Sequence, residues 1–558
     1  MERFIEKHSD EHFDIIVIGG GITGASVAYE AATRGLKVAL LEKDDFAGGT
    51  SSASSKLIHG GLRYLANGEI GMVRESLRER RVMSNIAPNF VYPIPILMPH
   101  TDKSFKNNKW VSKLGMLIYD ALSFDKAVTW DSSKRIPMHR TLSSREVLRR
   151  EPQVRAHGLT GASVFYDCLS LCPERLTLAF VKSAVSYGAK VANHAQVVGF
   201  HMDGEHRISG VRVRDVLCGA EYSIHGTITI NCAGPWADIV LGLASANGES
   251  GRTLSRSEGV HVITRKNLIS GQYIVGCVDA RGSHFFLIPW RGYTLIGTTD
   301  KRFNGEPDAY RVSTASLMEL IEAVNSAFGD GTLCYEDVEY AYGGLRPLVE
   351  VQTKETYSAS RRYEICDNAR QGLDGLITVE GGKFTTSRKL AAQCLRMVAA
   401  KLGRPLGKST TDKQRLFGCT IPDLQAFLDA ALQQHKDFQA STISYLSRTY
   451  GTEYEAVLQL AREDENLACT LDADGEILAQ VIYAIRQEMA RTLADIVFRR
   501  TGICTLGNPG DRVIERIALL AATELGWDKN RVELEIANVQ ARFRPPPHIG
   551  TARLTSSI

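Results

Sequence analysis

The sequence predicts an α/β protein with a Rossmann-like nucleotide-binding core, a sheet-rich domain inserted into that core, and an all-α C-terminal domain. Three observations lead to this prediction. A glycine-rich turn directly follows a short apolar strand near the N-terminus. Two later strand-like segments resemble returns to the same sheet, and stretches with many β-type residues lie between them. Beyond about residue 411, apolar residues recur at helical spacing.

The length and composition of the chain limit its class. Its 558 residues are enough for two or three domains, and its apolar and charged fractions are ordinary for a globular protein. The formal net charge of +3 gives no argument for nucleic-acid binding, which needs a concentrated basic surface. The 11 cysteines include no CxxC pair, so neither a zinc ribbon nor a redox dithiol is indicated, and we expect no metal.

The sequence contains no apolar run of about 18 residues, which a membrane-spanning helix would need. The polar N-terminus also lacks the apolar stretch of a signal peptide. We therefore expect a cytoplasmic protein whose contact with any membrane is peripheral. The apolar stretch at residues 90–98 is one candidate for such a contact, although a loop in the core explains it equally well.

The first βαβ unit is predicted from three consecutive segments. Residues 13–18 (FDIIVI) form a short apolar, β-branched run that is typical of a buried parallel strand. Residues 25–34 are rich in alanine and precede Gly35, as a helix that ends at a glycine does. Residues 37–41 (KVALL) form a second buried strand, which ends at Glu42.

The turn between the first strand and the helix carries a dinucleotide-binding fingerprint. Gly19, Gly21 and Gly24 follow the spacing GxGxxG, and Glu42 follows Gly21 by 21 residues. The glycines allow a tight turn, close approach of a pyrophosphate to the helix N-terminus, and close packing of helix on strand. A carboxylate at the Glu42 position accepts hydrogen bonds from a ribose hydroxyl and argues against a 2′-phosphate.

The later parts of the chain supply the remaining elements. Residues 227–231 (TITIN) and 375–379 (GLITV) are strand-like, and each runs into a glycine-containing turn. Residues 285–290 and 294–299 have the composition of strands in a second sheet. Residues 403–411 are rich in Gly, Pro, Lys, Ser and Thr, as a linker is, and the sequence beyond them is helical in pattern.

A hydroxyl-rich segment follows the βαβ unit. Residues 50–56 (TSSASSK) lead into residues 59–64 (HGGLRY). Small hydroxyl side chains suit close contact with a diphosphate and a flavin, but an ordinary serine-rich loop has the same composition. Composition alone does not decide between these interpretations.

Residues 50–65 (TSSASSKLIHGGLRYL), together with the preceding GGGITG, resemble the FAD-dependent glycerol-3-phosphate dehydrogenases, within the wider group of D-amino-acid-oxidase-like flavoproteins. Further matches follow in the family's order. They are NCAGPWAD (231–238), IPW (288–290), IGTTD (296–300), GGLRPL (343–348), EGGKFTTSRKLA (380–391), SRTYG (447–451) and DIVFRRTGICTLG (495–507). The resemblance therefore spans nearly the whole chain.

This resemblance implies an FAD-binding core, an antiparallel-sheet substrate cap and a helical C-terminal domain. We expect an oxidoreductase region at residues 10–410. Within it, the core takes about residues 12–75, 155–240 and 340–405, and the cap takes about 76–154 and 241–339. The helical domain takes residues 411–544, and residues 545–558 form a flexible, proline-containing tail.

The resemblance also implies an activity. The enzyme would oxidise sn-glycerol 3-phosphate to dihydroxyacetone phosphate through non-covalently bound FAD, and hydride would pass from C2 to flavin N5. Electrons would then pass to a quinone from a position on the inner face of the cytoplasmic membrane. A homodimer is left open. Neither the oligomeric state nor the membrane-contacting surface follows from the sequence.

The family's site residues are carried over by position. The implied catalytic residues are His261, Lys383, Arg346 and His59. The implied substrate-binding residues are Arg63, Tyr64, Arg346, Arg361, Lys383 and Thr385. The implied cofactor-binding residues are Gly19, Gly21, Gly24, Glu42, Thr50, Ser51, Ser52, Ser55, Gly60, Gly61, Ala233, Gly234, Trp236, Gly382, Lys383 and Thr385. Guanidinium groups suit a phosphate dianion because their fork matches two of its oxygens. Either histidine is suited to act as the base.

The sequence departs from the family's pattern at two places. Glu258 and Val260 stand where lysine and serine are frequent, and an acid that faced the site would oppose phosphate binding. Cys172 and Pro173 replace an acidic pair that usually precedes the helix of Arg175. These departures bear on substrate affinity and leave the flavin assignment unchanged.

Three other functions are consistent with parts of the sequence. A glycerol-3-phosphate oxidase would use O2, but such relatives carry an insertion after the GTTD segment, and residues 300–343 contain no long insertion. A flavin oxidoreductase of a hydroxy acid or amine would need a carboxylate clamp rather than several cations. A flavin-binding module without catalysis would not need the cations at all.

Overall fold

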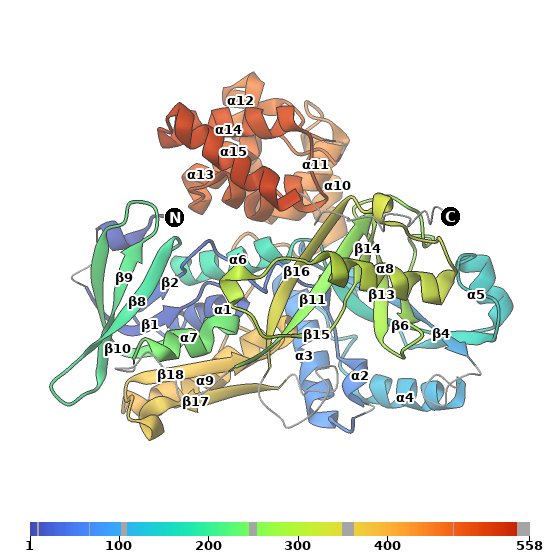
Figure 1. Cartoon of the computed structure of the whole chain (residues 1–558), viewed down its shortest axis with the longest axis horizontal. Helices are drawn as coiled ribbons and strands as arrows, with labels where there is room; N and C mark the ends of the chain where they lie inside the picture. The colour runs from blue at the N-terminus through green and yellow to red at the C-terminus, as the bar shows by residue number, and fades with distance from the viewer. Residues whose placement is uncertain are drawn as a thin grey trace, which may run out of the picture.

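The computed structural model describes residues 1–7, 11–65, 67–101, 109–244, 254–348, 362–472 and 474–543. Two β-sheets lie side by side in the lower part of the molecule, and the C-terminal helices pack above them (Figure 1). This is the architecture that the sequence predicts: a Rossmann-like core, a second sheet inserted into it and a helical C-terminal domain. The predicted tail, residues 545–558, lies outside the described residues.

The first sheet is the Rossmann-like core. Its path runs through β17 (Tyr363–Asp367), β18 (Leu376–Gly381), β10 (Glu221–Asn231), β1 (His12–Ile18), β2 (Val38–Leu41) and β7 (Lys190–Ala192). The four adjacent pairs from β18 to β7 are parallel, whereas β17 is antiparallel to β18. The hairpin of β8 (Ala195–Met202) and β9 (Ile208–Asp215) extends the long strand β10. Because parallel strands end at one edge, the turns after β1, β2, β10 and β18 meet there.

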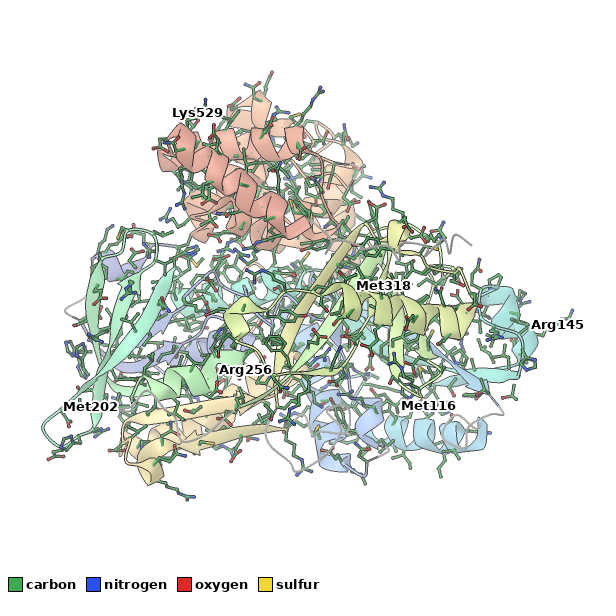
Figure 2. All side chains as sticks on the ribbon, in the orientation of Figure 1. Met116, Arg145, Met202, Arg256, Met318 and Lys529 are labelled. Atoms are coloured by element: carbon green, nitrogen blue, oxygen red, sulfur yellow. The ribbon has the colours of Figure 1, made fainter. Side chains whose placement is uncertain are left out.

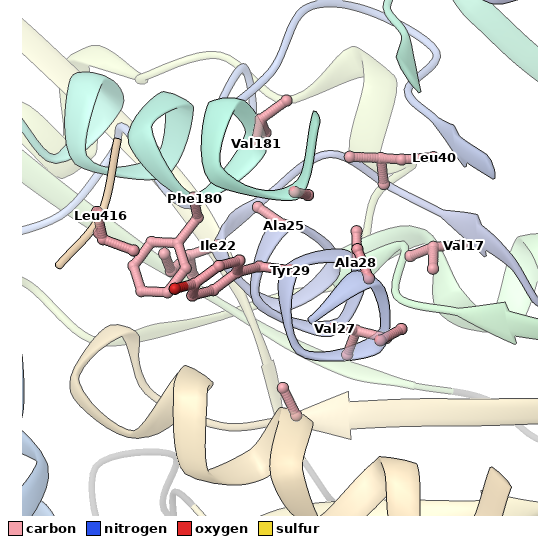
Figure 3. Close-up of a cluster of buried hydrophobic side chains, with 14 of the residues drawn as sticks. Val17, Ile22, Ala25, Val27, Ala28, Tyr29, Leu40, Phe180, Val181 and Leu416 are labelled. Atoms are coloured by element: carbon pink, nitrogen blue, oxygen red, sulfur yellow. The ribbon is translucent and has the colours of Figure 1, made fainter. Parts of the chain in front are cut away.

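Helices cover this sheet and bury its apolar strands. α1 (Ile22–Ala32) packs between α6 (Pro173–Ser186) and α9 (Ser387–Lys401). Figure 3 shows Tyr29 of α1 beside Phe180 of α6, with their ring centroids 6.0 Å apart in an edge-to-face arrangement. The many alanines of α1 let it lie close to both neighbours and to the strands beneath, which fixes the position of its N-terminus.

The second sheet forms the cap. Its path runs through β15 (Lys301–Phe303), β11 (Ser255–Thr264), β14 (Tyr293–Gly297), β13 (His284–Trp290), β12 (Ile274–Val278), β4 (Val91–Thr101), β6 (Leu159–Ser170) and β3 (Leu57–Ile58), with β5 (Arg140–Leu142) on β6 and β16 (Tyr340–Leu348) on β11. It is antiparallel except where β4 and β12 run parallel. α8 (Thr314–Phe328) packs against this sheet, and its apolar side chains join the cap's core.

The structure places three segments in the cap sheet that the sequence placed in the core. β3 and β6 pair with each other, β6 pairs with β4, and β16 pairs with β11 over nine residues. The sequence pattern did not single out these segments as strands, and the sheet that each one joins depends on partners far away in the chain. The candidate membrane contact at residues 90–98 forms most of the interior strand β4. Phe90 directly precedes this strand, and the side chains of Ile96 and Leu97 within it are buried.

Five further helices among the described residues connect the two sheets and surround the cap. They are α2 (Leu62–Leu65), α3 (Ile70–Ile86), α4 (Lys109–Leu122), α5 (Ser144–Arg150) and α7 (Ala237–Gly242). α3 lies between the core and the cap, and α4 lies along the lower edge of the cap in Figure 1. No helix in the described part of the chain is both long and apolar enough to cross a bilayer.

The C-terminal domain is helical, as predicted. It contains α10 (Leu424–Gln434), α11 (Ala440–Tyr450), α12 (Tyr454–Glu463), α13 (Ala479–Glu488), α14 (Asp511–Leu525) and α15 (Lys529–Phe543). These helices share one apolar core. Buried ion pairs join the domain to the first sheet's helices; Arg175 of α6, for example, binds both carboxylate oxygens of Glu488 at 2.8 and 2.9 Å.

Candidate active site

A cavity of about 1320 Å³ lies between the core and the cap and is lined by residues of both. It exceeds the roughly 300–1,000 Å³ of a usual small-molecule pocket, so it has room for a dinucleotide and a second ligand. The turns after β1, β2, β10 and β18 line it from the core, and strands of the second sheet line it from the cap. The site therefore forms at the carboxyl edge of the parallel strands.

The glycine fingerprint forms a cradle at the N-terminus of α1. Gly19 has φ = +104°, and a Cβ there would lie 2.6 Å from the carbonyl oxygen of Cys232. A Cβ on Gly24 would lie 1.9 Å from the carbonyl oxygen of Gly19, so the helix and the turn touch backbone to backbone. The space that Gly19 and Gly21 leave open belongs to the cavity, at the helix end that favours an anion.

Two polar side chains are positioned for the rest of a dinucleotide. Glu42 accepts hydrogen bonds from the backbone N–H groups of Gly20, at 2.6 Å, and Asp44, at 2.9 Å. Burial raises the pKa of Glu42 to about 7. The hydroxyl of Ser51 accepts from the N–H of Ile22 at 2.9 Å, directly at the start of α1. These groups fit a ribose and a diphosphate respectively.

Most of the implied cofactor residues line this cavity. Those that do are Gly19, Gly21, Glu42, Thr50, Ser51, Ser55, Gly61, Ala233, Gly234, Trp236, Gly382, Lys383 and Thr385. Trp236 is held at the rim because its Nε1–H donates to Asp308 at 2.9 Å, while the ammonium of Lys43 lies 4.2 Å from its ring centroid. The cradle, the acid and these surfaces together fit FAD.

Three of the implied cofactor residues do not line the cavity. Gly24 packs against the turn beneath it, as its close approach to Gly19 requires. The Ser52 hydroxyl donates to the carbonyl of Gly49 and so closes its own turn. Gly60 donates its N–H to Asp167, and a Cβ there would meet the hydroxyl of Tyr119 at 2.2 Å. Their roles are to shape the backbone rather than to contact a ligand.

Arg63, Tyr64 and Lys383 form a cationic cluster on the cavity wall. The Lys383 ammonium lies 4.0 Å from the centroid of the Tyr64 ring and donates to the Ser76 hydroxyl at 3.0 Å. Arg63 donates to the Tyr64 hydroxyl at 3.0 Å. Burial, reinforced by the charge of Arg63, lowers the pKa of Lys383 to about 7. An anionic ligand beside Lys383 would favour its protonated form.

His59 and Thr385 join this cluster from neighbouring segments. The His59 backbone N–H donates to the Thr385 hydroxyl at 3.2 Å, which ties the HGG segment to the turn after β18. Burial and the charges of Lys383 and Arg63 lower the pKa of His59 to about 3, so its imidazole is neutral.

Arg346 enters the cavity from strand β16 and is held by oxygen atoms of the cap. It donates to the Thr298 hydroxyl at 2.6 Å and to the backbone carbonyls of Thr299 and Glu258 at 3.2 and 3.3 Å. A Cβ on Gly259 would lie 1.9 Å from the Arg346 guanidinium, so a glycine is needed beneath it. The site thus fixes the guanidinium before any ligand is bound.

His261 lies on β11 within the same cavity. Its Nε2 is 2.9 Å from the hydroxyl of Ser55, and its ring stacks on Tyr342 with centroids 4.9 Å apart. In the described part of the chain its buried Nδ1 has no hydrogen-bond partner. Burial and the charge of Arg346 hold the pKa of His261 well below its usual range. The imidazole is therefore neutral and oriented by Ser55.

The sequence departures lie away from the cavity. The Glu258 carboxylate accepts a hydrogen bond from Ser316 of α8, so it faces the outer side of the cap sheet. Val260 is fully buried in the cap's apolar core. Cys172 and Pro173 begin α6, whose Arg175 faces the C-terminal domain. The acid at position 258 therefore does not oppose anion binding in the site.

The remaining predicted residue is Arg361, which lies outside the described residues. Conversely, the sequence did not single out Thr298, although it lies in the quoted IGTTD segment and holds Arg346. It also did not single out Asp167, which binds Arg80, the Tyr119 hydroxyl and the N–H of Gly60. The family motif could have indicated Thr298, whereas no sequence signal connects Asp167 to Gly60.

Comparison with known proteins gives two family matches. Residues 14–381 match the family described as FAD dependent oxidoreductase, and residues 409–532 match the C-terminal domain of alpha-glycerophosphate oxidase. The chain is 35% identical over 537 residues to a glycerol-3-phosphate dehydrogenase of Synechocystis sp., covering 94% of this chain and 95% of that protein. It is 31% identical over 557 residues to an aerobic glycerol-3-phosphate dehydrogenase of Staphylococcus saprophyticus, covering 97% of each.

Solved structures show the same similarity. The X-ray structure of the glycerol-3-phosphate dehydrogenase from Bacillus halodurans complexed with FAD has a TM-score of 0.77 and 27% sequence identity, covering 97% of this chain and 96% of that chain. The L-alpha-glycerophosphate oxidase from Mycoplasma pneumoniae with FAD bound shares the fold, with a TM-score of 0.53 and 16% identity over 73% of this chain.

Proposed function

Because the chain belongs to the FAD-dependent oxidoreductases, in the family of the glycerol-3-phosphate dehydrogenases, we propose that it oxidises sn-glycerol 3-phosphate to dihydroxyacetone phosphate and reduces a membrane quinone. FAD is its cofactor, and we expect it to bind non-covalently. The observation that carries the substrate assignment is the set of cations in one cavity with the flavin cradle, namely Arg63, Lys383 and Arg346.

These cations suit a phosphomonoester better than a carboxylate. A carboxylate is satisfied by a single bidentate guanidinium, whereas a phosphate dianion has three oxygens and two negative charges to distribute. Arg346 is held in place by Thr298, and Lys383 gains its proton most readily beside an anion. The relatives at 30–35% identity are named for glycerol 3-phosphate, which agrees with this charge distribution.

Different groups in the site have different roles in the oxidation. When bound, FAD supplies the two-electron acceptor for the hydride of C2. His261 takes the proton of the C2 hydroxyl, since its imidazole is neutral and Ser55 fixes its orientation. Lys383 and Arg63 stabilise the negative charge that develops on that oxygen. His59 is the alternative base; burial and neighbouring positive charges lower the pKa of both histidines, so the choice of His261 rests on its orientation by Ser55.

A membrane acceptor is supported by the surface of α4. Leu114 and Leu117 are 61% and 48% exposed, and Phe124 and Trp130, just after the helix, are 74% and 42% exposed. An exposed helix with apolar residues, continued by exposed aromatic residues in the segment after it, suits a protein that lies in the bilayer interface. Quinones dissolve in the lipid, so an enzyme that reduces them has to sit at its surface, here on the cytoplasmic side.

Steady-state assays test this function and its closest alternative. The FAD-loaded protein should reduce a dye with sn-glycerol 3-phosphate as donor, and should do so far more slowly with sn-glycerol 1-phosphate, lactate or glycine. With no dye, a quinone should accept the electrons faster than O2. Rapid stoichiometric peroxide formation would favour the oxidase instead, and activity with an amine or hydroxy acid alone would refute the substrate.

A further inference from the structure

The cavity has an apolar arm that the flavin cradle and the cations do not use. This arm lies between α4 and the strands β4 and β13 of the cap sheet. Its apolar lining consists of Val111, Leu114, Ile118, Ile96, Met98 and Phe286, and the same elements add the polar side chains of Ser112, His100 and His284. Glycerol 3-phosphate has no apolar group to place there, so the arm serves another ligand. Its continuity with the cationic cluster brings that ligand to the flavin end of the cavity.

Helix α4 forms the outer wall of this arm. Met116, labelled in Figure 2, and Tyr119 point inward and are 4% and 3% exposed. Leu114 and Ile118, in contrast, both line the cavity and remain exposed on the surface. The same side chains therefore contact the inside of the arm and the outside of the molecule. This marks the edge of α4 as the mouth of the cavity.

The surface around this mouth suits a lipid bilayer. Beyond Leu114 and Leu117, the exposed side chains Phe124, Val128 and Trp130 continue the apolar surface. The acid of α4, Asp120, is buried and binds both Lys126 and the His139 ring. Lys113 is therefore the exposed charge of this helix among its described side chains, and its sign matches anionic headgroups.

We propose that the apolar arm beneath α4 is the entrance and binding site for the tailed quinone. The helix edge at Leu114 and Ile118 would lie in the bilayer interface. A quinone with an apolar tail then passes from the lipid into the cavity without crossing water, and its tail stays against Met98 and Phe286. This inference rests on the proposed quinone-linked oxidation of glycerol 3-phosphate.

The overall exchange is balanced. The substrate loses one hydrogen from C2 and one from its C2 hydroxyl, which are two electrons and two protons. The quinone gains two electrons and two protons on its two oxygens and becomes a quinol. Because the tail takes no part in these steps, a quinone without a tail should still be reduced, only with weaker binding.

The test compares two α4 variants in the FAD-loaded, full-length enzyme. The variant Leu114→Glu with Ile118→Glu alters the mouth, and Leu117→Glu alters a neighbouring exposed side chain that does not line the cavity. The probes are a quinone with a ten-carbon tail, the same ring without a tail, and vesicles of anionic phospholipid. Two readouts are taken in detergent: KM for each quinone, and Kd for the tailed quinone from quenching of protein fluorescence. A third readout is the fraction of enzyme that binds to the vesicles without detergent.

The mouth variant should raise KM and Kd for the tailed quinone at least about tenfold, because two carboxylates replace apolar surface that the tail would bury. Its KM for the tail-less ring should change much less. Leu117→Glu should leave both quinones unaffected in detergent and should weaken only vesicle binding. Equal effects on the two quinones, or unchanged binding of the tailed quinone in the mouth variant, would overturn the inference.

Failure of the underlying function has a different signature. If glycerol 3-phosphate does not reduce the wild-type flavin, the substrate assignment fails while quenching by the tailed quinone still tests the arm. If the flavin is reduced but the wild type binds no tailed quinone, the arm assignment fails and the substrate assignment stands.

Discussion

Arg500 donates two hydrogen bonds to Asp45, from Nη1 to Oδ2 at 2.6 Å and from Nη2 to Oδ1 at 2.7 Å. Arg500 belongs to the C-terminal domain, and Asp45 lies three residues after Glu42 at the end of the first βαβ unit. Both side chains are buried. The neighbouring Arg499 binds the same carboxylate at 2.6 Å. The helical domain therefore holds the turn that presents Glu42 to the FAD cradle.

We expect Arg500→Gln to weaken both the domain contact and FAD binding. Removing one partner of a buried ion pair typically costs about 3–5 kcal/mol, and we expect the lower end of that range because Arg499 still binds Asp45. The free energy of unfolding should fall by about that amount, and Kd for FAD, measured from flavin fluorescence, should rise. The movement of the Glu42 turn causes the second effect.

Arg486→Gln is the matched control for this prediction. Arg486 lies in the same domain and binds Glu524 at 2.7 and 2.8 Å, but its side chain is 53% exposed. An exposed pair contributes about 0–1 kcal/mol, so stability and FAD affinity should change little. If Arg500→Gln lowers stability without changing Kd for FAD, the turn is not positioned by the C-terminal domain.

Substrate binding should weaken as pH rises through about 7, because the pKa of Lys383 is lowered to about 7 and only its protonated form attracts a phosphate dianion. The measurement is the Kd for glycerol 3-phosphate from the concentration dependence of flavin bleaching at pH 6 to 9. Lys383→Arg should remove this dependence, since a guanidinium keeps its proton throughout. If Kd in Lys383→Arg still rises with pH as it does in the wild type, a group other than Lys383 causes the pH dependence of substrate binding.

Arg346 should contribute to substrate binding through its fixed orientation. Arg346→Ala removes a charge-assisted contact, and we expect KM for glycerol 3-phosphate to rise about 100-fold. Thr298→Val removes one hydrogen bond to Arg346 and should raise KM roughly fivefold. Thr298→Ser keeps the hydroxyl, so its KM should stay close to the wild-type value. If Thr298→Ser behaves as Thr298→Val does, the hydroxyl does not orient the guanidinium.

The base is tested by His261→Asn. General base catalysis contributes about 10²–10⁴-fold, so the rate of flavin reduction should fall by that factor while Kd for substrate changes little. His59→Asn is the comparison and should have the smaller effect on this rate. Because the pKa of His261 is held below its usual range, the wild-type rate should not fall between pH 8 and 6 through histidine protonation. If His59→Asn lowers the rate of flavin reduction more than His261→Asn does, then His59 rather than His261 is the base.

Much of the core and its site could be predicted because short-range patterns determine them. The strand–glycine turn–helix unit is contiguous, so the spacing of Gly19, Gly21 and Glu42 alone predicts the cradle that the structure contains. The cations were located by resemblance rather than by physical pattern. Arg63 precedes Arg346 by 283 residues and Lys383 by 320 residues, and nothing in their local sequence requires the three to share a cavity.

Other features depend on long-range pairing that no local pattern contains. Whether β6 and β16 join the core or the cap is decided by their partners β4 and β11, which lie far away in sequence. The outward direction of the Glu258 carboxylate follows from the position of Ser316 on α8. The exposed face of α4 could not be distinguished from a buried one, since apolar spacing predicts a helix and not what covers it.

Anaerobic addition of sn-glycerol 3-phosphate to the purified, FAD-loaded protein tests the central claim most directly. The flavin absorbance near 450 nm should bleach rapidly, and a quinone added afterwards should restore it. A flavin that stays oxidised with this substrate, while a hydroxy acid or an amine bleaches it, would contradict the assignment of glycerol 3-phosphate.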